Sequence, residues 1–182
     1  DLSVQQLPYP QLRERLLAQG QVLSLPDLDD LQPVADAVVS IDSKSFPGIV
    51  LDDTSAQVGG DWVRSTNFKL HIGTGYVHDD RKGDGTATAT FRFKTPNSGR
   101  YELLMAYSAH ETRATNVSVT ITSGSHMEKL TVDQTKPLPD GKHFRSLGEI
   151  ELSADVETVI TMINQDTDGF VILDALQLLP VK

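Results

Sequence analysis

Apolar and polar residues alternate along much of the chain after residue 48. Residues 87–94 read Ala-Thr-Ala-Thr-Phe-Arg-Phe-Lys, and residues 117–122 read Val-Ser-Val-Thr-Ile-Thr. A period of two sends successive side chains to opposite faces of a strand. We therefore predict two strands, each with one face toward a core and one toward water. Residues 101–107 are apolar on both faces, which predicts a central strand.

Shorter apolar runs, separated by turn-forming Gly, Pro, Asn and Asp, complete the pattern. About eight strands at this spacing are typical of an antiparallel β-sandwich, so we predict an all-β, jelly-roll-like fold. The additional strands are expected at residues 49–51, 129–132, 144–152, 158–163 and 170–179.

The first 48 residues follow a different pattern. Leucines at helical spacing, a proline at the start and a glycine at the end predict a helix over residues 10–19. Residues 31–40 fit either a second short helix or an extended segment, and residues 43–48 resemble a linker. We therefore expect a helical extension and linker over residues 1–48, a boundary near Gly48, and a β-sandwich over residues 49–182.

Charge and composition exclude several classes of function. The chain has 182 residues, a formal net charge of −9 and a pI of about 4.9, which argues against nucleic acid and against anionic membrane surfaces. It contains no cysteine, so disulfides and thiolate metal sites are excluded. No apolar run approaches the length of a membrane span, so membrane insertion is not expected. Asp1 is no initiator residue, so we expect a fragment or a processed chain.

Catalytic motifs are not found. Gly73-Thr-Gly75 has no third glycine and no helix after it, so it is interpreted as a turn rather than a dinucleotide-binding loop. There is no Gly-x-Ser-x-Gly elbow. The five histidines lack zinc-site spacing and are interpreted as surface residues. We predict no catalytic residue in this chain.

Asp174 is the most unusual polar position. Both faces of the segment around it are apolar, so its carboxylate should be buried. A buried carboxylate needs hydrogen-bond donors or a cation. Two alternatives follow: ordinary donors, or a structural Ca²⁺ with help from Asp52 or Asp53.

Two aromatic residues follow glycine-rich stretches. Trp62 comes after Gly59-Gly60-Asp61, and Tyr76 follows Gly73-Thr-Gly75. A loop tryptophan either stacks on a sugar ring or plugs the end of a sandwich. Trp62 and Tyr76 are therefore candidate ligand-binding residues, with the plug as the alternative.

The segment 108–115 should form a loop at one end of the sandwich, where binding residues concentrate. Arg113 offers a planar fork of donors, and Asn116 both donates and accepts, which suits vicinal hydroxyls. We take both as candidate ligand-binding residues. The alternative is that they tie the loop to its own backbone.

Eight short stretches occur in a characteristic order along the chain. They are Ile49-Val-Leu-Asp-Asp53, Gly60-Asp-Trp62, Gly73-x-Gly-Tyr76, Gly99-Arg-Tyr-Glu102, Arg113-Ala-Thr-Asn-Val117, Val132-Asp-Gln134, Phe144-x-Ser-Leu-Gly148 and Gly169-Phe-Val-Ile-x-Asp-Ala175. Together they resemble the golvesin C-terminal-like, or xanthan-lyase carbohydrate-binding-like, module. This resemblance implies an accessory β-sandwich in a bacterial, extracytoplasmic (periplasmic or secreted) protein, with Arg113-Ala-Thr-Asn116 as the family's hallmark.

The N-terminal stretch 4–23 resembles the tail of the bacterial FAD-dependent oxidoreductase region that often precedes this module. The resemblance implies a flavoenzyme parent whose FAD lies upstream, with no cofactor in this chain apart from the Ca²⁺ considered above. Two functions remain open: a glycan-binding module whose partner is a polysaccharide, or a structural module that docks on the parent's catalytic domain. An independent lyase would need a Tyr107, His110 and Arg113 cluster in a cleft.

Overall fold

The computed structural model describes residues 39–68 and 70–181 of the chain. These residues form short and medium β-strands with two short 3₁₀ helices, so the predicted all-β fold is confirmed. The predicted helix over residues 10–19 lies outside the described residues. In the described part of the chain, no helix has the length and apolarity needed to cross a bilayer. The elements are β1 (Val39–Ile41), η2 (Ser43–Ser45), β2 (Ile49–Asp52), η3 (Asp53–Ser55), β3 (Gln57–Gly59), β4 (Val63–Ser65), β5 (Leu70–Ile72), β6 (Tyr76–His78), β7 (Thr88–Phe93), β8 (Gly99–Ala106), β9 (Val117–Ser123), β10 (His126–Val132), β11 (Arg145–Leu152), β12 (Thr158–Ile163), β13 (Ile172–Leu173) and β14 (Ala175–Pro180).

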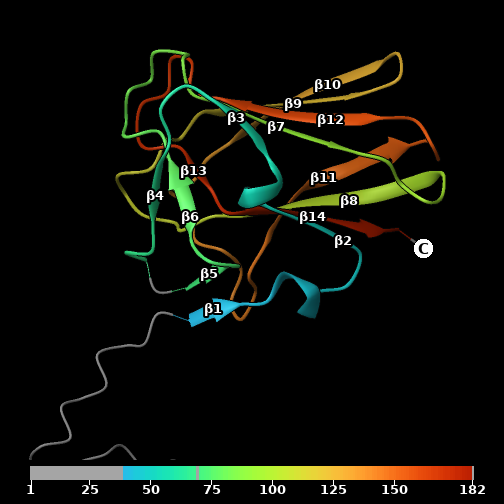
Figure 1. The fold of residues 1–182 in the computed structure, drawn as a ribbon, viewed down its shortest axis with the longest axis horizontal. Helices are drawn as coiled ribbons and strands as arrows, with labels where there is room; N and C mark the ends of the chain where they lie inside the picture. Colours follow the sequence, from blue (N-terminus) through green and yellow to red (C-terminus); the bar gives the residue numbers. More distant parts are fainter. Residues whose placement is uncertain (1–38, 69, 182) are drawn as a thin grey trace, which may run out of the picture. The chain divides into compact units, whose positions relative to one another are not determined.

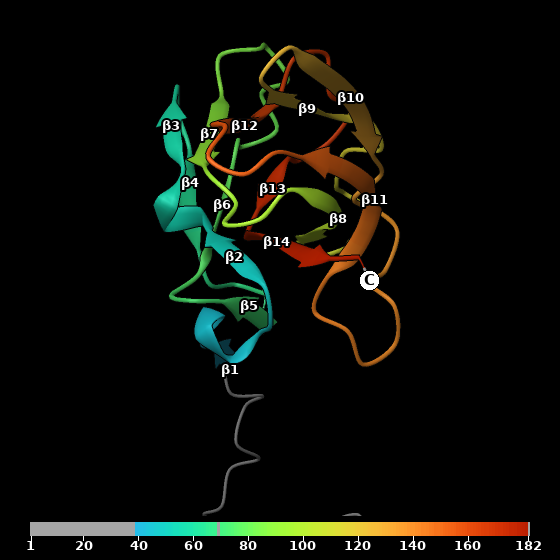
Figure 2. The ribbon, with the colours of Figure 1, turned by 90° about the vertical axis from the view of Figure 1, so that its right-hand side faces the viewer.

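Two antiparallel sheets form the layers of a sandwich (Figure 1). One has the order β10-β9-β12-β7-β3 and the other the order β11-β8-β14-β2. A smaller sheet, β13-β6-β4, lies at one end, and β1 pairs with β5 in parallel. Figure 2 shows the same layers after a quarter turn, with β11, β8, β14 and β2 in one curved layer.

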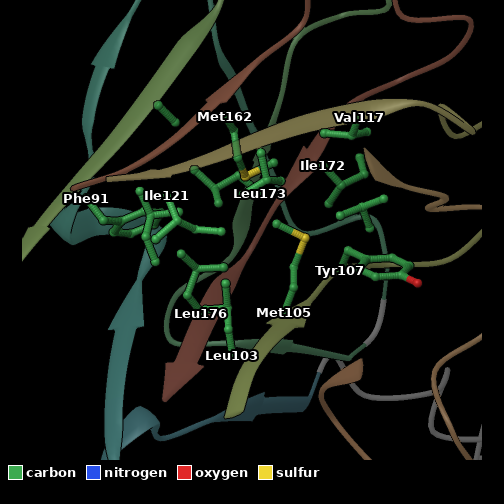
Figure 3. Close-up of a cluster of buried hydrophobic side chains, with 14 of the residues drawn as sticks. Phe91, Leu103, Met105, Tyr107, Val117, Ile121, Met162, Ile172, Leu173 and Leu176 are labelled. Atoms are coloured by element: carbon green, nitrogen blue, oxygen red, sulfur yellow. The ribbon is translucent and has the colours of Figure 1, made fainter. Parts of the chain in front are cut away.

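Alternation along the strands builds the core between the layers. Ala89 and Phe91 of β7 point inward and are buried, while Thr88, Thr90 and Arg92 face outward. Strands β9 and β12 repeat this pattern, so the predicted one-sided strands are confirmed. Figure 3 shows the side chains that meet between the sheets, with the Tyr107 hydroxyl directed away from the cluster.

Strand β8 has the central position that its two apolar faces predict. It lies between β11 and β14, with Leu103 and Met105 fully buried. A bulge between Ser146 and Gly148 shifts the register of β11 on β8. Strand β8 is therefore paired along both edges. Its inner face is buried, whereas Leu104 on the other face is partly buried against a second, smaller apolar cluster.

The three-residue strands between residues 39 and 78 were not predicted from the sequence, whereas β2 was expected at residues 49–51. β1, β3, β4, β5 and β6 each span three residues, which is too short for a period of two to be recognised. Residues 43–48, expected to be a linker, contain η2, and Phe46 packs edge-on against Phe144 at 5.0 Å. The boundary near Gly48 stays a prediction.

The predicted strand over residues 170–179 is broken at Asp174. β13 pairs with β6 in the small sheet, whereas β14 pairs with β8 and β2 in the sandwich. Asp174 sits between these two strands and therefore at the junction of two sheets. Its backbone oxygen accepts a hydrogen bond from the Asp53 N–H (2.7 Å).

Candidate functional site

Arg113 lies in the loop between β8 and β9, where 7% of its surface is exposed. Its Nε donates to the backbone oxygen of Ser108 (3.0 Å), and its Nη2 donates to the Ser108 hydroxyl (3.3 Å). The guanidinium carbon lies 4.5 Å from the centre of the Phe68 ring, a cation–π distance. Burial lowers the pKa of Arg113 below its ordinary value, with Tyr76 opposing the shift. These contacts are those expected if Arg113 ties its loop to its own backbone.

Asn116 closes the other end of the same loop. Its Nδ2 donates to the backbone oxygen of Asp166 (2.9 Å), and its Oδ1 accepts from the Asp168 N–H (3.1 Å). The Thr115 N–H donates to the Asp168 carboxylate (2.7 Å), as does the Thr115 hydroxyl, and these bonds lower the pKa of Asp168. The loop is thus clamped to residues 166–168 through both ends of the Asn116 amide.

Tyr76 is buried in the core. Its hydroxyl accepts a hydrogen bond from Ser65 Oγ (3.1 Å), and its ring meets the Phe68 ring edge-on at 6.4 Å. Phe68 therefore contacts both Tyr76 and Arg113, which brings these two predicted residues to one place.

Trp62 makes its contacts elsewhere, where β3 meets β7. Its Nε1 donates to the backbone oxygens of Gly59 (3.1 Å) and Thr88 (3.0 Å). The ring is half-buried against the core. This arrangement is the one expected if Trp62 plugs the end of the sandwich, which was the alternative to stacking on a sugar ring.

An open groove lies next to Phe68. Its volume is about 530 Å³, within the usual range for ligand clefts. Three segments that are distant in sequence meet there, and most of the lining is apolar. The lining residues are Asn67, Phe68, Leu70, Tyr107, Ser108, Ala109, Pro137 and Leu138.

His71 is buried, which contradicts the prediction that the histidines lie at the surface. The histidines were expected at the surface, but His71 is 3% exposed, and neither ring nitrogen has a hydrogen-bond partner among the described residues. It lines a cavity of about 10 Å³ with His143 and Asp174. His71 lies on β5, which pairs with β1 through Ser40, and this pairing was not visible in the sequence.

The carboxylates of Asp174, Asp53 and Asp52 lie close together. Asp174 is 4% exposed, which confirms its predicted burial, and both its oxygens accept from the Ile72 N–H (3.0 and 3.2 Å). Asp53 Oδ2 pairs with Arg64 Nη2 at 2.8 Å. Asp52 Oδ1 accepts from the Thr54 N–H (3.1 Å) and caps η3.

Burial, with a smaller contribution from neighbouring carboxylates, raises the pKa of two of these groups. Burial raises the pKa of Asp174 to about 8, the Ile72 N–H opposes the shift, and the charges of Asp53 and Asp52 add to it. Burial also raises the pKa of Asp53 to about 7, against the attraction of Arg64. Near pH 7 the cluster therefore holds protons as well as negative charge.

The same carboxylates are the predicted calcium ligands. Carboxylate oxygens suit Ca²⁺, and the buried Asp52 Oδ2 and Asp53 Oδ1 have no hydrogen-bond partner within the described residues. However, over residues 39–68 and 70–181 no group of three or more His, Asp or Glu side chains is arranged to hold a metal ion. The structural Ca²⁺ stays a prediction.

Neither Phe68 nor Gln134 was among the functional residues predicted from the sequence. Phe68 is a lone aromatic residue within a polar stretch, and its contacts with Arg113 and Tyr76 depend on the tertiary fold. Gln134 lies in a family-like motif, but its complete burial was not expected of an amide. The available signal for Phe68 was its position as a lone aromatic residue within a polar stretch.

The comparisons with known families identify the module. The family model of the golvesin C-terminal domain matches residues 49–180. The chain belongs to this family. The match covers the sandwich from β2 to β14, which includes the groove and the Asp174 cluster.

One sequence relative of this golvesin C-terminal domain is a xanthan lyase from Bacillus sp. (strain GL1). It is 30% identical over 142 residues, which cover 75% of the chain and 15% of the lyase. A solved xanthan lyase from Paenibacillus superposes with a TM-score of 0.66 and 30% identity, over 73% of the chain and 13% of that protein. The chain thus spans a small fraction of these relatives.

More distant structures share the fold of the golvesin C-terminal domain. A family 35 carbohydrate-binding module from Clostridium thermocellum has a TM-score of 0.53 at 17% identity, covering 71% of the chain and 97% of that module. The CBM35 of Cellvibrio japonicus Abf62 has a TM-score of 0.51 at 15% identity, covering 74% and 94%. At this identity, the likeness shows the fold alone.

Proposed function

We propose that this chain is a non-catalytic accessory module that attaches a larger enzyme to a polysaccharide. The observation that carries the proposal is the 30% identity over 142 residues with 15% of a xanthan lyase. A segment of that size within a polysaccharide-degrading enzyme fits an appended module. The carbohydrate-binding modules that share its fold support the same function.

The proposed binding surface is the end of the sandwich that carries the β8–β9 loop. Arg113 and Asn116 shape this loop through their hydrogen bonds, and Tyr76 supports Phe68 at its edge. Trp62, which was also a candidate ligand-binding residue, donates instead to backbone oxygens where β3 meets β7 and is not part of this proposed surface. A rigid loop on a sheet scaffold is a usual place for recognition.

The alternative function is docking on the parent enzyme without glycan binding. Val58 of β3 and Val63 of β4 are exposed apolar side chains on short strands. Such side chains become buried if another domain packs there. This module would then complete its parent rather than bind a ligand.

The parent is proposed to be an extracytoplasmic bacterial enzyme. The resemblance of residues 4–23 supports an FAD-dependent oxidoreductase, whereas the matched relative supports a lyase. A flavin absorbance spectrum of the full-length parent separates these two parents, because only the oxidoreductase would carry FAD upstream.

Electrophoresis through gels that contain soluble polysaccharides tests the glycan proposal. We expect at least one polysaccharide to slow the folded 182-residue chain relative to a non-binding reference protein. If no polysaccharide of a broad panel slows it, glycan binding is refuted and docking becomes the leading function.

A further inference from the structure

The groove beside Phe68 has walls that are already held in place. The Tyr107 ring is buried, and its hydroxyl donates to the backbone oxygens of Lys136 (3.0 Å) and Asp133 (3.4 Å). These bonds hold the segment that leads to Pro137 and Leu138 against the end of β8. A ligand entering here would pay little ordering cost, because the protein side is fixed in advance.

Phe68 is held from several directions. The Arg113 guanidinium stacks on its ring at 4.5 Å, and the ring meets His110 edge-on at 5.7 Å and Tyr76 edge-on at 6.4 Å. Arg113 is itself fixed by Ser108. The ring is half-buried and lines the groove, so it offers a rigid aromatic surface there.

The polar groups of the groove can serve hydroxyl-bearing ligands. The Ser108 hydroxyl accepts a hydrogen bond from Arg113 (3.3 Å), which leaves its own proton for donation. Asn67 is exposed and carries an amide that both donates and accepts. One aromatic face flanked by such groups suits a pyranose ring, whose C–H edges meet the negative face of the ring while its hydroxyls reach the polar groups.

The charge of the groove and of the whole chain favours a neutral ligand over an acidic one. None of the residues that line the groove is ionised at neutral pH, because Tyr107 is the only titratable one among them and burial raises its pKa above the ordinary value. The chain carries a net charge of −9, which repels polyanions at long range. An acidic polysaccharide therefore gains no salt bridge from the lining itself. Arg145 lies at the rim, where its Nη2 already donates to the backbone oxygen of the lining residue Pro137 (2.8 Å), so it is the net negative charge of the chain that disfavours a polyanion.

We propose that this groove binds a short stretch of neutral polysaccharide, with Phe68 as the stacking surface and Asn67 and Ser108 as polar contacts. This inference rests on the proposed glycan-binding function and assigns both its site and its ligand class. The buried Arg113 acts as a support for Phe68 rather than as a ligand contact.

The test uses gel retardation of the 182-residue chain with β-1,4-mannan and β-1,3-galactan as neutral probes and xanthan as the acidic probe. Phe68→Leu removes the aromatic face, and Ala109→Leu narrows the groove. Met127→Ala, at the exposed tip of the β9–β10 hairpin, is the matched control. Thermal melts of every variant establish that each is folded at the assay temperature.

We expect a neutral probe to retard the wild type and Met127→Ala equally, and both groove variants to bind at least about ten-fold more weakly, or about 1.4 kcal/mol. Retardation that both groove variants retain would overturn the groove as the site and leave the glycan function intact. Retardation by xanthan alone would overturn the neutral ligand class. If none of the three probes retards the wild type, the groove variants are compared on whichever polysaccharide of the broad panel does. If no polysaccharide of that panel retards the wild type, this inference fails together with the function on which it rests.

Discussion

The side-chain amide of Gln134 forms two hydrogen bonds with the backbone of Ile172, in the way that a residue of a neighbouring strand does. Gln134 Nε2 donates to the Ile172 oxygen (2.7 Å), and the Ile172 N–H donates to Gln134 Oε1 (2.8 Å). Gln134 is fully buried. A side chain thus satisfies both backbone groups of a residue in β13, which pairs with β6.

Replacing Gln134 by Met should lower the free energy of unfolding by about 2–4 kcal/mol, because two buried backbone groups lose their partners. Urea denaturation measures the change. Gln57→Met, on the exposed side of β3, is the matched control and should change stability by less than about 0.5 kcal/mol. Equal effects of the two substitutions would contradict the pairing.

Arg113→Ala should lower the free energy of unfolding by about 1–3 kcal/mol, because the Ser108 oxygen loses a charged donor and Phe68 loses its stacking partner. Arg113→Lys should recover little of this, since lysine lacks the planar fork. Arg100→Ala, which removes an exposed pair with Glu149, serves as control and should stay within about 0.5 kcal/mol. Unchanged stability of Arg113→Ala with loss of polysaccharide binding would instead indicate direct ligand contact.

The carboxylate cluster predicts an unusual pH dependence in metal-free buffer. The pKa values of Asp174 and Asp53 are raised from an ordinary value of 3.8 to about 8 and about 7. A raised folded-state pKa contributes stability that is fully present below the unfolded pKa and is lost as pH rises through the folded value. Melting temperature should therefore fall between about pH 4 and pH 8. Asp174→Asn, which cannot ionise, should flatten this decline, and an unchanged slope in that variant would contradict the assignment.

Bound Ca²⁺ would oppose this fall in melting temperature with rising pH, because a cation stabilises the ionised carboxylates. If Ca²⁺ binds Asp52, Asp53 and Asp174, a chelator should lower the melting temperature of the wild type at pH 8 and leave Asp174→Ala unaffected. Differential scanning calorimetry with and without added Ca²⁺ measures both. Identical wild-type melts would refute the metal and leave the Ile72 hydrogen bonds as the explanation of Asp174.

A chain that starts at Ser45 should still unfold cooperatively, because the sandwich strands β2 to β14 remain. It should be less stable than a chain that starts at Ala37, since it lacks the β1–β5 pairing and Ile41, which packs near Phe144. Thermal melts of the two chains make the comparison. Absence of a transition in the shorter chain would refute a domain boundary near Gly48.

The sequence predicted the long strands because their alternation is a local property. β7 and β9 read directly as one-sided strands, and Asp174 was expected to be buried because apolar residues occupy both faces around it. The three-residue strands and the burial of His71 depend on pairing between distant segments, such as Ser40 with His71. The same holds for the candidate site. The loop that carries Arg113 was predicted from the local sequence, whereas the contact between Arg113 and Phe68 joins distant segments and was not predicted.

The central position of β14 has a consequence for biosynthesis. β14 is inserted between β8 and β2, two strands that end 69 and 123 residues before it begins. Until residues 175–180 leave the ribosome, β8 carries an unpaired edge, and such edges recruit other strands. The nascent module therefore cannot close one sheet progressively during translation. The β11-β8-β14-β2 sheet can form only after β14 has been synthesised. A stalled or shortened chain that lacks β14 would therefore stay incompletely folded and be bound by chaperones.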